Sequence, residues 1–368
     1  MKPAERPRDH AGLLVSACAN EADFAAWDAF LSDLPGAHYF QTYGWLRSYE
    51  PMGFKSEILV CRGGGRITGG VGYLTARVPV LPWRIAIVPH GPAVADMEAG
   101  TWSGVMHALD ARLREQRTVY AQVYPHERAE ETSVLRALEQ EGFDQPALFT
   151  SHRFSSTPVL VPLAGRSEEE VLGGLRQETR SHVRRSLKSG LELRTEVDAA
   201  LFDRVHDLFV ENGELVGYQA RPRASLRSAW DWLAPRGGAM LLQAWQGDVL
   251  VGALLQIYTG RTAYYLVGAV KRGFNAQYPA EFLHWAALRE ALRRGCEAYD
   301  LVNLVSPGVE RFKRGFRPDV WSWHEPRTKV YLPGPARLIH ALEGWMRPLV
   351  RRLGRLRAGR SSTAEGAA

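Results

Sequence analysis

Two basic stretches of the sequence contain residues that could act on an acyl or phosphoryl group. In the first, at 310–316, Lys313 stands between two arginines on a short predicted helix, 309–314. The second contains Arg180 and Arg184, which are four residues apart and therefore share one face of a predicted helix. A fixed cation can stabilise an oxyanion that develops in a transition state, and arginine can bind phosphate. Solvated basic helix faces have the same pattern, so spacing alone leaves both interpretations open.

Other catalytic motifs are missing from the sequence. It contains no Ser-His-Asp pattern, no phosphate-binding P-loop and no HExxH zinc motif. The eleven histidines form no close pair with metal-ligand spacing, and Cys18, Cys61 and Cys296 form no CxxC. We therefore expect no metal and no bound cofactor. The scattered cysteines fit a reducing compartment.

The elements that must position these residues follow one order in both halves of the chain. The first half is predicted to form a helix at 21–34, capped by Asn20, a hairpin of strands 56–61 and 67–78, a helix at 101–116, a strand at 119–123 and a helix at 132–141. The second half is predicted to form strands at 241–245, 249–258 and 262–269, a helix at 281–294, a strand at 298–303 and the helix at 309–314. We interpret this order as a divergent internal duplication. The alternative is chance, because hairpins and glycine-capped helices are common.

The composition is that of a folded protein with two domains. A chain of 368 residues exceeds one ordinary core, and 45% of the residues are hydrophobic and 23% charged. Seven arginines and two glutamates give residues 333–368 a charge of +5 out of the total of +6, so the rest of the chain is nearly neutral. We expect no signal peptide and no membrane-spanning helix, because no apolar run approaches about 18 residues. Residues 1–10 and 358–368 are expected to be disordered tails.

Six segments, taken in order, resemble a known family. They lie at 40–45, 180–193, 217–221, 263–269, 295–300 and 308–316. Together these segments resemble the Fem-type (FemABX) peptidyltransferases over roughly residues 38–330. The resemblance implies an α/β (α+β) fold of two tandem GNAT-like acyltransferase domains, each a mixed, mostly antiparallel sheet flanked by helices, plus a C-terminal basic helix. The first domain would span 11–157, on the acceptor side, and be completed by 320–357, and the second would span 158–319.

The resemblance also implies an activity. Fem-type enzymes move an amino acid from aminoacyl-tRNA to the stem peptide of a peptidoglycan precursor, either lipid II or a UDP-linked precursor, and so form an interpeptide bridge. The implied protein is a monomeric cytoplasmic aminoacyltransferase with aminoacyl-tRNA as co-substrate and no other cofactor. Ordinary GNAT enzymes hold the CoA pyrophosphate on a glycine-rich loop at a helix N-terminus. The equivalent stretch, 271–280, has one glycine and a proline, which argues against acetyl-CoA.

The resemblance assigns a role to each candidate residue. Lys313 would polarise the ester carbonyl of the acyl donor, and Phe312 would pack beside it. Arg221 would contact acceptor phosphates, for which a planar charged fork is well suited. A surface lysine and a structural loop arginine are the alternatives. The other expected substrate-binding residues, each of which could instead serve the core or the surface, are Gln41, Trp45, Tyr265, Arg180 and Arg184.

Three positions depart from the family pattern. Tyr49 stands where the family has a lysine, Tyr124 where an acidic residue is common, and Ser225 where an aromatic residue is usual. By the resemblance, all three belong to acceptor recognition. They leave open an alternative function, a GNAT-like N-acyltransferase that acts on a polysaccharide or small molecule with another acyl donor.

The last segment has apolar residues at helical spacing, from Leu338 to Leu356, interleaved with arginines. We consider two roles for 335–357. It could lie on the cytoplasmic face of the membrane that carries a lipid-linked acceptor, or it could pack on the body with a solvated basic face. Pro348 would kink the helix in either case.

Overall fold

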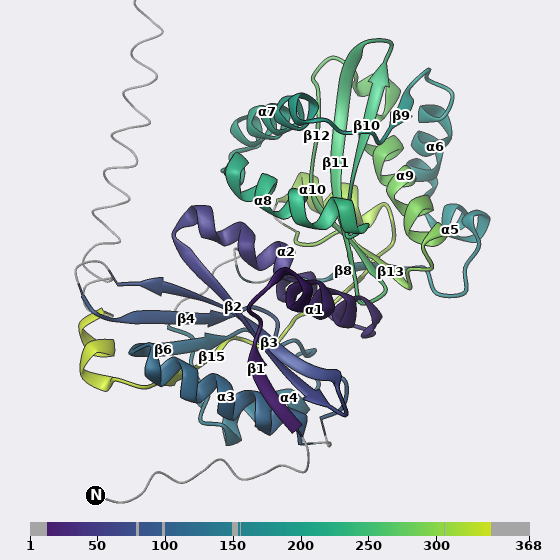
Figure 1. The fold of residues 1–368 in the computed structure, drawn as a ribbon. Helices are drawn as coiled ribbons and strands as arrows, with labels where there is room; N and C mark the ends of the chain where they lie inside the picture. The colour runs from purple at the N-terminus through teal and green to yellow at the C-terminus, as the bar shows by residue number, and fades with distance from the viewer. Residues whose placement is uncertain are drawn as a thin grey trace, which may run out of the picture.

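The computed structural model describes residues 13–78, 81–97, 100–148, 154, 156–304 and 306–339. These residues form two α/β bodies, each built on one sheet (Figure 1). The first half of the chain forms the lower body in this view, and the second half forms the upper one. The predicted tails, 1–10 and 358–368, and residues 340–357 of the predicted C-terminal helix lie outside the described residues.

The first sheet has the strand order β1-β2-β3-β4-β6-β15-β7, with β5 paired to β3. Its long antiparallel hairpin, β2 and β3, turns at Gly64 and Gly65, both of which have the left-handed φ that glycine adopts easily. Strands β4 and β6 form a parallel pair in the middle of the sheet. The bounds are β1 Leu13–Ala17, β2 Phe54–Gly63, β3 Arg66–Arg77, β4 Arg84–Val88, β5 Ala93–Val94, β6 Thr118–Val123, β7 Gln145–Pro146 and β15 Arg327–Val330.

The second sheet has the strand order β14-β8-β13-β12-β11-β10-β9. Its antiparallel hairpin is β10 and β11, and its central parallel pair is β12 and β13. The bounds are β8 Val159–Pro162, β9 Glu192–Arg194, β10 Ala239–Gln246, β11 Val249–Thr259, β12 Thr262–Val270, β13 Ala298–Asp300 and β14 Asp319–Val320.

One strand from the end of the described chain, β15, returns to the first sheet. The two sheets have corresponding strand orders, as expected for a duplication: β1-β2-β3-β4-β6-β15-β7 in the first corresponds to β9-β10-β11-β12-β13-β8-β14 in the second. The sixth strand of each sheet, however, comes from the segment that follows the other body in sequence. Strand β8 pairs with β13 and β14 in the second sheet, and β15 pairs with β6 and β7 in the first. Figure 1 shows β8 beside β13 in the upper body and β15 beside β6 in the lower one. The first sheet is therefore complete only when β15, from the end of the described chain, is present, whereas every strand of the second sheet lies between residues 159 and 320.

Helices cover both sheets and fill the space between them. Apolar residues of α3 and α4 pack on the outer face of the first sheet, and those of α5, α6 and α9 pack on the outer face of the second. A single core that includes α1, α2, α7 and α8 lies between the sheets and joins the bodies. The bounds are α1 Glu21–Asp33, α2 Tyr43–Leu46, α3 Thr101–Glu115, α4 Ser133–Gln140, α5 Glu168–Gly174, α6 Gln177–Ser186, α7 Ala199–Val216, α8 Arg223–Leu233, α9 Pro279–Arg293 and α10 Pro307–Arg314.

Close contacts hold the two bodies together. A Cβ atom on Gly44 of α2 would lie 2.4 Å from the Leu233 side chain of α8, so only glycine lets these helices approach. The carboxylate of Asp28 accepts hydrogen bonds from the Tyr43 amide at 2.6 Å and the Trp232 indole at 2.8 Å. Asp28 and Tyr43 belong to the first body and Trp232 to the second. The bodies therefore meet in a specific, hydrogen-bonded interface.

The structure confirms the mixed α/β class with two sheets flanked by helices. The Asn20 side chain caps α1, as predicted, by accepting the Asp23 amide at 3.0 Å. The expected strand at 298–303 was wrong in length, because β13 ends at Asp300. Strand β4 and helix α8 were missed by the sequence analysis.

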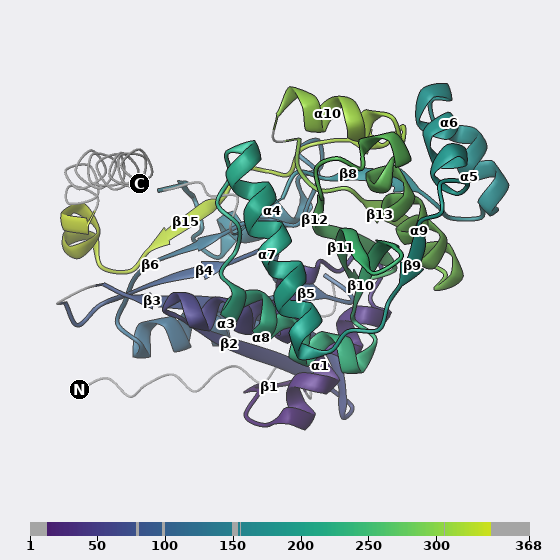
Figure 2. The ribbon, with the colours of Figure 1, turned by 90° about the horizontal axis from the view of Figure 1, so that it is seen from above.

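The described start of the C-terminal segment packs on the first body. Residues 333–339 are helical and follow β15 (Figure 2). Ala336 and Ile339 are buried against Val119 and Tyr120 of β6. Among the described residues, no helix is both long and apolar enough to cross a membrane.

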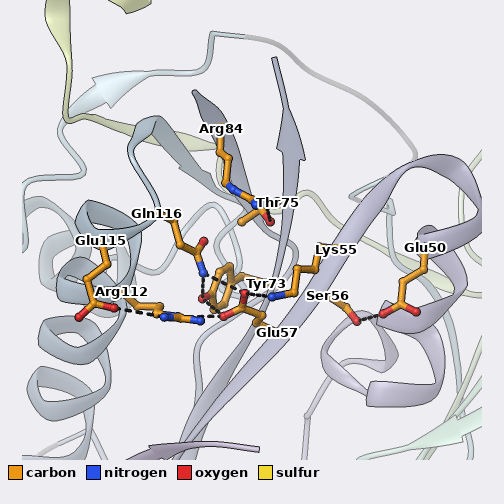
Figure 3. A network of polar contacts seen from close by, with 10 residues as sticks. All are labelled: Glu50, Lys55, Ser56, Glu57, Tyr73, Thr75, Arg84, Arg112, Glu115 and Gln116. Carbon is orange, nitrogen blue, oxygen red and sulfur yellow. Dashed lines mark hydrogen bonds and ion pairs between the residues drawn. The ribbon is translucent and has the colours of Figure 1, made fainter. Parts of the chain in front are cut away.

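A carboxylate at the edge of the first core ties α3 to the sheet (Figure 3). Glu57 of β2 accepts hydrogen bonds from Lys55 at 2.8 Å, Tyr73 at 2.9 Å, Arg112 at 3.1 Å and Gln116 at 2.9 Å. Burial acts to raise the pKa of Glu57, but the hydrogen bonds from Lys55, Tyr73 and Arg112 outweigh it and hold the pKa below its usual value. The stabilisation is therefore present above the ordinary carboxyl pKa and is lost as the pH falls through the lowered one.

Replacing Glu57 by glutamine should lower the free energy of unfolding by about 1–3 kcal/mol, because the charged acceptor that four donors share is lost. Urea titration followed by circular dichroism measures the change. Glu115→Gln is the matched control, because Glu115 contacts the same Arg112 but is 66% exposed. It should change stability by less than about 0.5 kcal/mol. Equal losses in the two variants would contradict this role for Glu57.

Candidate active site

The parallel strands of the second sheet separate and leave a cavity. Strand β13 ends at Asp300, opposite Tyr264, whereas β12 continues to Val270. A register shift against β11 places an irregularity of β12 beside Tyr265, and such irregularities often occur next to active sites. The cavity has a volume of about 140 Å³. Its wall includes Tyr265, Gly268, Leu283, His284 and Phe312.

Lys313 lies buried beside this cavity, only 5% exposed. Its ammonium donates hydrogen bonds to the backbone carbonyls of Leu301 at 2.8 Å, Val302 at 2.6 Å and Asn303 at 2.8 Å. Burial lowers the pKa of Lys313 to about 8, although the charge of Asp300 acts to raise it. All three ammonium protons are therefore engaged, and the group is mostly protonated at neutral pH.

The loop that Lys313 holds has a strained backbone. Val302 and Asn303 have φ values of 36° and 54°, in the left-handed region that β-branched residues such as valine rarely adopt. Asp300 holds the same loop from the other side, because its carboxylate accepts the amides of Val302 at 2.8 Å and Val159 at 2.9 Å. Burial raises the pKa of Asp300 to about 6. Asp300 and Lys313 together clamp a conformation that the chain would not adopt unaided.

Helix α10 is built to present Lys313 inward. The Ser306 hydroxyl accepts the Val309 amide at 3.4 Å, and Pro307 occupies the first helical position, where a missing N–H costs little. A Cβ atom on Gly315 would lie 2.1 Å from the Thr179 hydroxyl, so glycine is required where the helix ends against α6. These local signals fix both ends of the helix.

Phe312 and Tyr265 both line the cavity beside Lys313, and their roles in binding substrate stay predictions. The Lys313 ammonium is 5.3 Å from the centre of the Tyr265 ring, and Phe312 contacts the His284 ring at 5.2 Å between centres. His284 Nδ1 lies 2.8 Å from the Tyr299 hydroxyl. Burial lowers the pKa of His284 to about 3, with a further contribution from Lys313, so the imidazole is neutral. Neither His284 nor Asp300 was predicted from the sequence to have a role, although Asp300 stands in one of the six family-like segments.

This arrangement limits what Lys313 can do directly. A substrate carbonyl can accept a hydrogen bond from the ammonium only by replacing one of the three backbone carbonyls. The observed contacts make Lys313 the residue that holds the 301–303 loop beside the cavity. Its action on a substrate carbonyl stays a prediction.

The structure places Gln41 inside the first body. Its amide nitrogen donates to the carbonyls of Gly72 at 3.0 Å and Pro89 at 2.6 Å, and its oxygen accepts the Gly72 amide at 2.7 Å. Both amide protons are thus used by the protein itself. A Cβ atom on Gly91 would lie 2.5 Å from the Gln41 nitrogen, so Gln41 shapes the turn at 89–91.

Arg221 and Trp45 meet at the interface between the bodies. The Arg221 guanidinium lies 4.3 Å from the Trp45 ring centre and 4.4 Å from that of Tyr49. It donates to the hydroxyls of Ser225 and Ser48, both at 2.6 Å. Two of the departures from the family pattern, Tyr49 and Ser225, therefore contact Arg221 itself. Much of its hydrogen-bonding capacity is spent within the protein.

Arg180 and Arg184 separate in role, although both lie on α6. Arg180 donates to the carbonyls of Gly173 at 2.6 Å and Leu175 at 3.3 Å, which end helix α5. Arg184 is exposed on the surface. Of the two, Arg184 has the geometry to meet an external phosphate.

The start of α9 lacks the features of a pyrophosphate cradle. Pro279 has no N–H at the first helical position, and Tyr278 before it has a left-handed φ of 55°. The Tyr278 ring stacks on His182 of α6 at 4.1 Å between centres. Backbone amides that could surround a CoA pyrophosphate are therefore reduced in number and partly covered by α6.

Comparisons with known proteins agree with this architecture. Residues 174–314 match the family model described as acetyltransferase (GNAT) domain. No curated protein matches the chain. Among solved structures, FemX superposes with a TM-score of 0.77 at 16% identity, covering 88% of this chain and 100% of FemX.

Two further solved structures share the fold. A tandem GNAT protein from the clavulanic acid biosynthesis pathway has a TM-score of 0.53 at 15% identity, over 86% of this chain and 98% of its own. The C-terminal domain of a protein described as a lysylphosphatidylglycerol synthetase from Agrobacterium fabrum has a TM-score of 0.51 at 14% identity, over 88% and 96%. The predicted Fem-type tandem GNAT fold is confirmed, as is the prediction of an acyltransferase.

Proposed function

Because the chain has the tandem GNAT fold of FemX, we propose that it is an aminoacyltransferase that uses aminoacyl-tRNA. Its acceptor would be the stem peptide of a peptidoglycan precursor, lipid II or a UDP-linked form, and its product an interpeptide bridge. The observation that carries the proposal is the cavity beside the loop that Lys313 holds, in a domain whose α9 terminus lacks a CoA cradle.

The chemistry would use the cavity to hold the aminoacyl ester. A neutral acceptor amine attacks the ester carbonyl, the carbonyl oxygen becomes an oxyanion, and the ribose hydroxyl of the tRNA leaves with a proton. The protein must hold the two substrates together and stabilise the oxyanion. The protonated Lys313 supplies positive charge beside the cavity, and the ring of Phe312 supplies an apolar wall.

The surroundings of the cavity suit an RNA donor. Arg184, Arg185 and Lys188 are exposed on α6 and the turn after it, and α6 packs against α9 and the end of α10. Phosphates attract such a group of exposed cations electrostatically. The site would therefore face cytoplasmic tRNA, with a lipid-linked acceptor reached at the membrane surface.

One observation favours a second candidate, an N-acyltransferase with a polysaccharide or small-molecule acceptor. Arg221 already donates to Ser48 and Ser225, and aromatic rings cover it. An acceptor without a phosphate group would need no free N–H donors from Arg221. This candidate would also take its acyl group from a donor other than aminoacyl-tRNA.

The test is to incubate the purified protein with charged tRNAs and labelled lipid II or its UDP-linked precursor. We expect transfer of an amino acid to the acceptor, seen as a mass increase of one residue. A parallel reaction contains acetyl-CoA and amino-sugar acceptors. No transfer from any charged tRNA removes the first proposal, and acetylation in the parallel reaction would establish the second.

A further inference from the structure

The first sheet has a cluster of histidine and tryptophan rings at the place that corresponds to the donor cavity of the second sheet. Strands β4 and β6 form its central parallel pair, and their pairing ends at Val88 and Val123. Just beyond these ends stand His90 and His126. A third histidine, His38, stacks on His90 at 4.2 Å between ring centres, and Trp323 from the segment after β14 lies 4.5 Å from His126 and 5.4 Å from His90.

The hydrogen bonds of this cluster define the proton positions of two imidazoles. The Phe40 amide donates to His38 Nδ1, so the His38 proton is on Nε2, 3.3 Å from the Ser156 hydroxyl. The Ser156 amide donates to His90 Nε2 at 3.3 Å, so the His90 proton is on Nδ1. Burial lowers the pKa of His38 and His90 well below the ordinary value, and lowers that of His126 to about 4. All three rings are therefore neutral.

Two donors in the cluster have no acceptor among the described residues. His90 Nδ1 and the Trp323 indole nitrogen are both buried, and no described group accepts a hydrogen bond from either of them. An unpaired buried donor is unusual in a folded protein and calls for an explanation. Metal binding does not supply one, because the described residues contain no group of His, Cys, Asp or Glu side chains arranged to hold a metal ion.

We propose that the cluster of His90, His126 and Trp323 is a binding subsite for a carboxamide group. The carboxamide oxygen accepts from His90 Nδ1–H and the Trp323 indole, and its N–H donates to the neutral ring of His126. His126 and Trp323 are partly exposed, so a ligand reaches the subsite from their side, whereas His90 lies 1% exposed behind them. A carboxylate would bind less well because it has no N–H to donate to His126. A cation would be disfavoured because the two N–H donors of His90 and Trp323 would point at it.

The subsite is coupled to the donor cavity through strand β12. Tyr264 contacts His38 at 5.0 Å between ring centres, and the next residue, Tyr265, lines the donor cavity. Neighbouring residues of a strand face opposite sides, so one strand presents a side chain to each site. A carboxamide occurs in peptides and in acetamido sugars. The peptide source rests on the proposed function, because a stem peptide is its acceptor.

The test observes the tryptophan indoles directly. In protein labelled with ¹⁵N at tryptophan, the indole signals of Trp323 and Trp102 are assigned by their absence in Trp323→Phe and Trp102→Phe. N-acetylalanine methylamide, N-acetylglucosamine and methyl acetate serve as probes. We expect the Trp323 signal to shift with at least one carboxamide, and to shift less with methyl acetate, which offers no N–H.

Trp102 provides the matched control. Its indole nitrogen is also buried without a partner, but it lies in the outer core of the first body on α3. Trp323→Phe should weaken carboxamide binding at least about tenfold, and Trp102→Phe should leave it unchanged. Neither variant should lower the melting temperature through the lost N–H, because that group has no partner to lose.

The outcomes separate the possibilities. A shift with the peptide probe alone assigns the subsite to a peptide, and a shift with the sugar probe alone assigns it to an acetamido sugar. No shift of the Trp323 signal with either carboxamide, or an equal shift of Trp102, overturns the proposal. Because this experiment measures binding, its result tests the carboxamide subsite independently of the transfer assay.

Discussion

Replacing Lys313 by methionine is expected to lower the turnover of acyl transfer by at least about tenfold, equivalent to about 1.4 kcal/mol in the activation barrier. Methionine preserves the length of the side chain and removes its charge and its three donors. The carbonyls of Leu301, Val302 and Asn303 then lose their shared partner. The loop beside the cavity then loses this support, and the positive charge beside the cavity is gone.

The same substitution should also reduce stability. The sequence alone suggests that a lysine between two arginines can be replaced without cost to the fold. The structure changes this expectation, because the ammonium is buried and its partners are backbone carbonyls. Leaving buried acceptors without donors costs about 1–3 kcal/mol. Turnover is therefore compared at a temperature where circular dichroism shows both proteins folded.

Arg311→Met is the matched control, because Arg311 lies two residues away on the same helix but is exposed. It should leave both turnover and stability nearly unchanged. If Lys313→Met retained full turnover, the lysine would have no part in the reaction. If both variants lost turnover equally, the effect would belong to the basic surface of α10.

The pH dependence gives a second readout of Lys313. Turnover that requires its ammonium falls as the pH rises through about 8, and this fall is absent in Lys313→Met. Stability moves in the opposite direction. The folded pKa is about 8 and the ordinary value is 10.5, so between these values the unfolded chain binds more protons and the contribution of this residue to stability rises with pH.

The isolated halves of the chain, residues 1–157 and 158–368, are each expected to fail to fold. The first lacks β15, and its strands β6 and β7 would face an empty position in the sheet. The second half begins at residue 158 and therefore contains every strand of its own sheet, as well as β15. Its apolar face that packs against the first body, however, is exposed to water in the isolated half. Circular dichroism and size-exclusion chromatography distinguish folded from unfolded or aggregated halves.

Co-expression of the two halves is the control. When both are present, β15 can enter the first sheet and the shared core can form, so a soluble complex is expected. A folded, monomeric fragment 1–157 would contradict the requirement for β15. Failure of the co-expressed halves to associate would show that the covalent link between the bodies is itself needed.

Much of the fold could be predicted from local patterns. The helices α1, α3 and α9 and the hairpins β2–β3 and β10–β11 were expected within a few residues of their observed bounds, because apolar periodicity, caps and glycine turns are encoded over short distances. Strand β4 was missed although Ile85, Ala86, Ile87 and Val88 form a short apolar run. Such a run does not by itself distinguish a strand from a connecting segment.

The candidate site could be predicted only in part. The sequence pointed to Lys313, Phe312 and Tyr265, and the structure brings them to one cavity. The sequence could not show that Gln41 hydrogen-bonds the turn at 89–91 or that Arg180 hydrogen-bonds the carbonyls at the end of helix α5. Gln and Arg side chains hydrogen-bond backbone carbonyls or substrates equally well, and only the position of the partner decides between them.

The order of most elements, the internal duplication and the helix that carries Lys313 could be predicted from the sequence alone. They follow from residue types that are close along the chain. Three features follow only from the folded arrangement: the return of β15 to the first sheet, the burial of the Lys313 ammonium on three carbonyls, and the contacts among His90, His126 and Trp323. Each of these depends on contacts made by packing, between groups whose local sequence does not specify their partners, so composition and spacing alone could not place them.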